Sequence, residues 1–200
     1  MEKTMILNKQ EKKVAKITAF REALEIAAKS KPDVLQQLEW RNELKYFPKG
    51  CCSLASNFLG RYLIDAELGL HPFILQIDAN ESFRTATDSS IHAHSIISLD
   101  GEYIDITLDQ FREHDNRISI EPIECGGKLS QLLKNVLRYG GTISTRAINI
   151  KSRYEDGEEL YSWLRETANS KLPPNYHENS CNSLANLVSL KIPQAFITGK

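Results

Sequence analysis

The dipeptide Asp100-Gly101 constrains the fold of this chain more than any other sequence feature. It lies between two runs rich in apolar and β-branched residues, which extend over 91–99 and 102–108. An Asp-Gly pair between two such runs is typical of a β-hairpin with a two-residue turn. The sequence therefore predicts an antiparallel pair of strands closed by this turn.

The turn also determines which residues of the two strands share a face. Leu99 would pair with Glu102, and counting outward from this pair puts His94 and Asp105 on the same face as diagonal neighbours. Such neighbours have Cα atoms about 7–8 Å apart, which allows their side chains to hydrogen bond. A register shifted by one residue would separate the two side chains.

Most residues before the hairpin have helical periodicity, and the residues after it include segments of helical periodicity and segments typical of strands. Helices are predicted at 10–30, 34–44, from Cys51 or Cys52 to 63, and at 129–137, 158–168 and 183–190; further strands are predicted at 73–77, 118–123 and 142–150; and 78–90 is predicted to be a surface loop. This mixture predicts an α+β fold. The first helices either belong to the domain or form an arm for a partner.

Composition narrows the class of protein. The 200 residues are 41% hydrophobic and 26% charged, enough apolar surface for one core and too much for a disordered chain. The 25 basic residues balance the 26 acidic ones, which indicates neither nucleic acid nor membrane as a partner. No secretory signal or apolar run of roughly 18–20 residues is present. We expect a cytoplasmic single domain over 1–200, with a helical part at 1–46, a catalytic core at 47–125 and a mixed helical part at 126–200.

The four cysteines are Cys51, Cys52, Cys125 and Cys181. Their spacing supports neither a disulfide scaffold nor a structural zinc site. Cys52 stands at the predicted start of an apolar helix, where unpaired backbone N–H groups and the helix dipole favour a thiolate. Cys52 is the predicted nucleophile and Cys51 its nearest rival, whereas Cys125 and Cys181 are expected to be buried packing residues.

Two segments carry recognisable motifs. The first reads F-P-K-G-C-C-S-L-A-S from Phe47 to Ser56, and the second, after His94, reads D-G-E-Y-I-D-I-T-L-D-Q-F from Asp100 to Phe111. Together they resemble the G-x-C-x-x-x-S helix start and the H-x-W…D-G-x-x-x-D-I-T-x-D-Q-F hairpin of bacterial transglutaminase-like, papain-type cysteine hydrolases. The resemblance covers about a third of the chain.

The resemblance implies a papain-like or transglutaminase-like core, in which the helix carrying the cysteine packs on an antiparallel sheet carrying histidine and aspartate, with extra helices at both ends. It implies a triad of Cys52, His94 and Asp105 that acts on an amide of a protein or peptide substrate through a thioester. The activity would be that of a peptidase, a deamidase or a transglutaminase, with no cofactor. Gln110 is expected to fix the strand exit rather than take part in catalysis.

Two other interpretations stay open at this point. His92 and His94 form an H-x-H pair that would present both rings on one face of a strand, and Asp105 or Asp109 would complete a site for a divalent metal. Ile96 stands where the family has an aromatic residue, which leaves room for a binding or regulatory module without turnover. His92 also rivals His94 as the catalytic histidine, although the eleven-residue step from His94 to Asp105 matches the family better.

Overall fold

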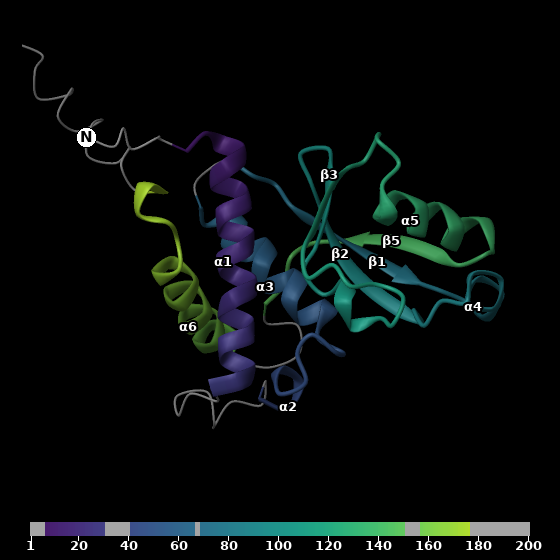
Figure 1. Cartoon of the computed structure of the whole chain (residues 1–200), viewed down its shortest axis with the longest axis horizontal. Coiled ribbons are helices and arrows are strands. Elements are labelled where there is room, and N and C mark those ends of the chain that lie inside the picture. Colours follow the sequence, from purple (N-terminus) through teal and green to yellow (C-terminus); the bar gives the residue numbers. More distant parts are fainter. Residues whose placement is uncertain (1–6, 31–40, 67–68, 151–156, 177–200) are drawn as a thin grey trace, which may run out of the picture.

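The computed structural model describes residues 7–30, 41–66, 69–150 and 157–176 (Figure 1). In chain order, the elements are α1 (Lys9–Ser30), α2 (Arg41–Leu44), α3 (Cys52–Ile64), β1 (Phe73–Asp78), α4 (Glu81–Thr87), β2 (Ala93–Leu99), β3 (Glu102–Asp105), a 3-10 turn at Leu108–Gln110, β4 (Ser119–Pro122), α5 (Lys128–Arg138), β5 (Thr142–Arg146), α6 (Gly157–Ser170) and a 3-10 turn at Pro174–Tyr176. The predicted α+β class is confirmed.

The five strands form one antiparallel sheet in the order β4-β3-β2-β1-β5. The predicted hairpin register is confirmed, because Leu99 pairs with Glu102. Both turn residues have positive φ, 48° and 78°, as a hairpin turn that follows the twist of its strands requires. The ladder between β2 and β3 extends only to Ile97 and Ile104, and beyond this pair the two strands no longer pair with each other.

Helices cover both faces of this sheet (Figure 1). On one face α3 packs against β1 and β2, and α1 packs on α3; on the other face α5 packs against β1, β4 and β5. Neighbouring strand residues therefore belong to different cores: Ile74 and Ile97 join the first, and Leu75 and Ile96 the second. No helix in the described part of the chain is long and apolar enough to cross a membrane.

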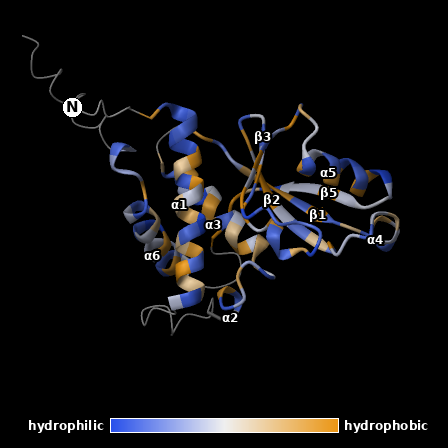
Figure 2. Cartoon of the chain, in the orientation of Figure 1, coloured by the Kyte–Doolittle hydropathy of each residue, from blue (hydrophilic) through white to orange (hydrophobic). Residues whose placement is uncertain are grey.

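The first helix belongs to the folded core rather than to a detached arm. Hydrophobic and hydrophilic residues alternate along α1 (Figure 2), and its residues Ile17, Phe20 and Leu24 are fully buried. Their core also includes residues of α3 and of α6, which lies beside α1 (Figure 1). The hydrophobic effect of this burial holds the two ends of the described chain together.

Several predictions of local structure are wrong. The segment 78–90 contains α4, because Asn80 accepts a hydrogen bond from the Phe83 N–H at 2.9 Å and caps the helix. Cys125 is exposed rather than buried, since it lies in the turn after β4. The strands predicted at 102–108 and 142–150 end earlier, at Asp105 and Arg146. Most of the helix predicted at 34–44, the helix predicted at 183–190 and Cys181 lie outside the described residues.

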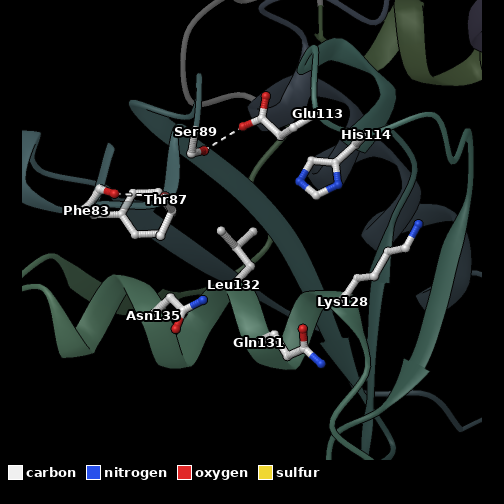
Figure 3. A pocket seen from close by; sticks show the side chains of 9 residues that line it. All are labelled: Phe83, Thr87, Ser89, Glu113, His114, Lys128, Gln131, Leu132 and Asn135. Carbon is white, nitrogen blue, oxygen red and sulfur yellow. Dashed lines mark hydrogen bonds between the residues drawn. The ribbon is translucent and has the colours of Figure 1, made fainter. Parts of the chain in front are cut away.

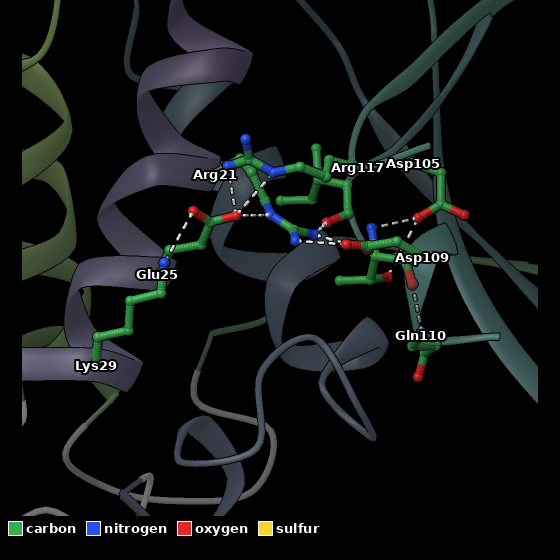
Figure 4. A network of polar contacts seen from close by, with 9 residues as sticks. Arg21, Glu25, Lys29, Asp105, Asp109, Gln110 and Arg117 are labelled. Carbon is green, nitrogen blue, oxygen red and sulfur yellow. Dashed lines mark hydrogen bonds and ion pairs between the residues drawn. The ribbon is translucent and has the colours of Figure 1, made fainter. Parts of the chain in front are cut away.

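A buried arginine joins α1 to the chain that follows β3 (Figure 4). Arg21 is 2% exposed and donates to both carboxylate oxygens of Asp109, at 3.0 and 2.7 Å, and to the carbonyl of Ile106. Its Nε donates to Glu25 at 2.9 Å. Because Ile106 and Asp109 closely follow Asp105, these bonds also fix the end of the hairpin.

Replacing Arg21 with methionine is expected to lower the free energy of unfolding by about 3 kcal/mol, because it leaves the partly buried carboxylate of Asp109 without its cation. Urea unfolding followed by circular dichroism measures this loss. Arg112→Met is the matched control, since Arg112 pairs with Asp88 at the surface and an exposed pair contributes at most about 1 kcal/mol. Equal losses in the two variants would contradict a structural role for the buried network.

Candidate active site

His94 and Asp105 form a buried pair where the two hairpin strands separate. Their exposed fractions are 0% and 2%, and the His94 Nε2 lies 2.5 Å from the Asp105 Oδ2. The other carboxylate oxygen accepts from the N–H and the hydroxyl of Thr107, at 2.8 and 3.2 Å. The structure thus brings together the two side chains that the register placed on one face. Because Nε2 is bound to the carboxylate, Nδ1 is the ring nitrogen left for another partner.

Cys52 is the first residue of α3, and the main chain of β2 positions it. The main-chain groups of Ser95 point away from β1, and the ladder with β3 ends at Ile97 before reaching them. Residues of α3 take the place of that missing strand partner. The Ser56 hydroxyl donates to the Ser95 carbonyl at 2.9 Å, and the Ser95 N–H lies close enough to the sulfur of Cys52 to lower the pKa of its thiol. Since Cys52 and Ser56 are one helical turn apart, these two contacts align the start of α3 with β2.

The electrostatic environment favours a charged Cys52–His94 pair. Burial raises the pKa of the Cys52 thiol, but hydrogen bonding to His94 and the charge of that ring lower it by more, leaving it below its ordinary value. Burial likewise lowers the pKa of His94, but the charge and hydrogen bond of Asp105, together with Cys52, raise it above its ordinary value. Both shifts favour a thiolate beside an imidazolium, and the thiolate is the nucleophilic form of cysteine.

The two adjacent cysteines have opposite environments. Cys51 is completely buried, and its sulfur lies 3.1 Å from the carbonyl of Glu43 and 3.4 Å from that of Lys49. Burial raises the pKa of its thiol to about 12. Cys52 is partly exposed and contacts His94. The geometry therefore favours Cys52 over Cys51 as a reactive thiol.

Gln110 connects three parts of the site. Its amide nitrogen donates to the Thr107 carbonyl at 2.9 Å and lies 3.4 Å from the Nδ1 of His94. Its amide oxygen accepts from the Gly50 N–H at 3.1 Å, which ties down the loop leading into α3. Gln110 thus fixes the exit of β3, as predicted, and also holds the loop that precedes Cys52. The neighbouring Phe111 covers the His94 ring edge-on, with 4.9 Å between ring centroids.

The H-x-H motif does not assemble a metal site in the described part of the chain. His92 is exposed, whereas His94 is completely buried and bound to Asp105. Asp109, the other proposed ligand, is bound to Arg21. Among the residues that the structure describes, no three His, Cys, Asp or Glu side chains are grouped to hold a metal ion.

Two polar residues that the sequence motifs do not include join β5 to the start of α3. Arg146 donates from Nη1 to the Asn57 Oδ1 and from Nη2 to the Ser53 Oγ, both at 3.0 Å. Asn57 is only 3% exposed, and its oxygen also accepts from the Asn149 N–H at 2.9 Å. Asn57 could have been found from the sequence, because it is a polar amide next to Phe58 within the apolar stripe of a predicted helix.

A separate pocket of about 200 Å³ lies beside α4 and α5 (Figure 3). Its lining residues come from α4, α5 and the connecting segments: Phe83, Thr87, Ser89, Glu113, His114, Lys128, Gln131, Leu132 and Asn135. Burial raises the pKa of Glu113, but hydrogen bonds from Ser89 and Ser90 lower it by more, to about 2. None of Cys52, His94 and Asp105 lines this pocket.

The known proteins that this chain resembles have names that assign no activity. No family model and no solved structure matches the chain. Two curated relatives, each called uncharacterized protein YuaU, come from Escherichia coli strains K12 and UTI89 and are 34% identical over 115 residues. That alignment covers 58% of this chain and 49% of each relative, so the chain spans about half the length of the curated relatives it matches.

Alkylation by iodoacetamide is expected to begin at lower pH for Cys52 than for an ordinary thiol, because a lowered pKa keeps Cys52 as thiolate there. Cys51 should stay unlabelled through neutral pH, since its pKa is raised to about 12. Tandem mass spectrometry of the peptide that contains both residues assigns the label. His94→Gln should shift the Cys52 profile to higher pH, and labelling of Cys51 before Cys52 would reverse our assignment.

Proposed function

We propose that this protein is a cysteine hydrolase or acyltransferase that acts on an amide of a protein or peptide. The observation that carries the proposal is the chain of contacts from Cys52 through His94 to Asp105 at the start of a helix. We also propose that the fold is a papain-like or transglutaminase-like core, since α3 carries the cysteine and the antiparallel hairpin that it packs on carries the other two residues.

The chemistry follows from these three side chains. The Cys52 thiolate attacks the amide carbon, and a C–S bond forms while the carbonyl π electrons move to oxygen. The first backbone N–H groups of α3 and its positive dipole end stabilise this oxyanion. The His94 imidazolium then gives its proton to the amide nitrogen, and the C–N bond breaks to leave a thioester. Asp105 holds the ring orientation throughout.

A second nucleophile completes the reaction. Neutral His94 takes a proton from water or an amine, which attacks the thioester carbon and displaces the Cys52 thiolate. Water gives hydrolysis or deamidation, and an amine gives transamidation. We propose no cofactor, because the three side chains supply nucleophile, base and orientation. The free cysteines of the described residues fit a reducing compartment, and we propose the cytoplasm.

The contact between Phe111 and His94 favours an enzyme over a binding module. Ile96, which stands where the family has an aromatic residue, is fully buried in the core beneath α5. Phe111, which directly follows the 3-10 turn at Leu108–Gln110, supplies an aromatic contact to the His94 ring instead. A covered imidazole is shielded from water, which strengthens its interactions with Asp105 and Cys52.

Three assays on one substrate panel test the proposal: peptide cleavage, release of ammonia from glutamine peptides, and incorporation of a fluorescent primary amine. Cys52→Ala is expected to lower any of these activities by at least about a thousandfold, because the nucleophile is lost, and His94→Gln should do the same. Cys51→Ala is the matched control and should retain most of the activity.

The pattern of products also decides among the alternatives. Cleavage, ammonia release and amine incorporation identify peptidase, deamidase and transglutaminase activity respectively. If the folded protein forms none of these products while Cys52 reacts with iodoacetamide only as fast as a free thiol, the binding-module interpretation replaces the enzyme.

A further inference from the structure

Arg146 places a positive charge beside Cys52 without an acidic partner among the described residues. Its guanidinium donates to Ser53, the residue after Cys52, and to Asn57, one turn further along α3. Both acceptors are neutral. Arg21 and Arg117, by contrast, form ion pairs with carboxylates. Of the five N–H donors of a guanidinium, these two hydrogen bonds leave three for another group.

The position of this charge is electrostatically unfavourable in isolation. The first turn of a helix carries the positive end of the helix dipole, so it attracts anions and repels cations. Burial also lowers the pKa of Arg146, whereas the charge of the Cys52 thiolate raises it, so the two side chains interact. The unfavourable energy of a positive charge at this place is offset when an anion binds beside the guanidinium.

The surrounding structure keeps the guanidinium in place. Asn57, which accepts from Arg146, is buried and also binds the main chain of Asn149. The segment after β5 packs directly on α3, because a Cβ added at Gly60 would lie 2.2 Å from the Cδ1 of Ile148. Arg146 is therefore pre-organised, and less conformational entropy is lost when its remaining donors bind a ligand.

We propose that Arg146 binds a carboxylate of the substrate next to the amide that Cys52 attacks. The inference rests on the proposed function and names its substrate class: peptides or amides with an acidic group beside the reacting carbonyl. A carboxylate accepts two parallel N–H bonds from a guanidinium, which matches the donors that remain. The carboxylate belongs either to the last residue of a chain or to an acidic side chain.

Iodoacetate and iodoacetamide test this proposal without a known substrate, because they alkylate a thiolate by the same reaction and differ in one carboxylate. Arg146→Gln is expected to lower the ratio of the iodoacetate rate to the iodoacetamide rate at Cys52 by about fivefold. Arg138→Gln is the matched control, since it removes the same charge from the exposed end of α5 and should leave the ratio unchanged. Arg146→Lys should restore part of the ratio, and added salt should reduce it in the wild type.

The outcomes separate this inference from the proposed function. Equal slowing of both reagents in Arg146→Gln would mean that Arg146 acts only on the thiolate, and unchanged rates of both reagents would mean that Arg146 meets no anion. Either result overturns the inference. A reactive Cys52 would still keep the proposed function. A Cys52 inert to both reagents overturns both. Two small acids, added as protectants of Cys52 against iodoacetamide, identify the source of the carboxylate. N-acetylglycine carries the carboxylate of a last residue, and the α-amide of N-acetylglutamate carries that of an acidic side chain. N-acetylglycinamide is the neutral control.

Discussion

The separation of β2 from β3 beyond Ile97 is the constraint on which the candidate site depends. A continued ladder would pair the main chain of Ser95 with the next strand, and an unpaired buried N–H or carbonyl costs free energy. The Ser56 hydroxyl of α3 satisfies the carbonyl, and the Ser95 N–H faces the sulfur of Cys52, whose pKa it lowers. The main-chain groups that a strand would have paired therefore help to position a cysteine at a helix start. His94, one residue before Ser95, reaches the sulfur from the same strand.

This arrangement needs support from parts of the chain far from it in sequence. Where β3 leaves its ladder with β2, Asp105 still pairs with Ser119 of β4, and contacts of the following residues help to hold its carboxylate. Arg21 of α1 binds Ile106 and Asp109, and Gln110 binds the loop before α3. The contacts of Arg21 are buried or partly buried, and there the lower dielectric strengthens paired groups and penalises unpaired ones. The buried polar groups thus set the geometry, and the apolar cores supply the stability that holds it.

The sequence predicts those features that depend on local patterns. The Asp100-Gly101 turn was sufficient for the register that brings His94 and Asp105 together. Apolar periodicity was sufficient to start a helix at Cys51 or Cys52, and α3 begins at Cys52. The sequence did not predict the roles of Arg21 and Arg146, because each binds residues more than eighty positions away and no local pattern indicates such contacts. The helix α4 was missed because its single cap, Asn80, stands in a polar segment without apolar periodicity.

The proposed chemistry gives each of the two cations near Cys52 a separate task. A Cys52 thiolate and the Asp105 carboxylate would carry two negative charges, and a His94 imidazolium would offset one of them. A substrate carboxylate would add another, and the repulsion between like charges in a partly buried site would oppose its binding. In the proposed mechanism Arg146, which comes from β5, would offset that charge without competing for the Nδ1 of His94. One cation would then serve proton transfer and the other substrate binding, so each can be changed by mutation without removing the other.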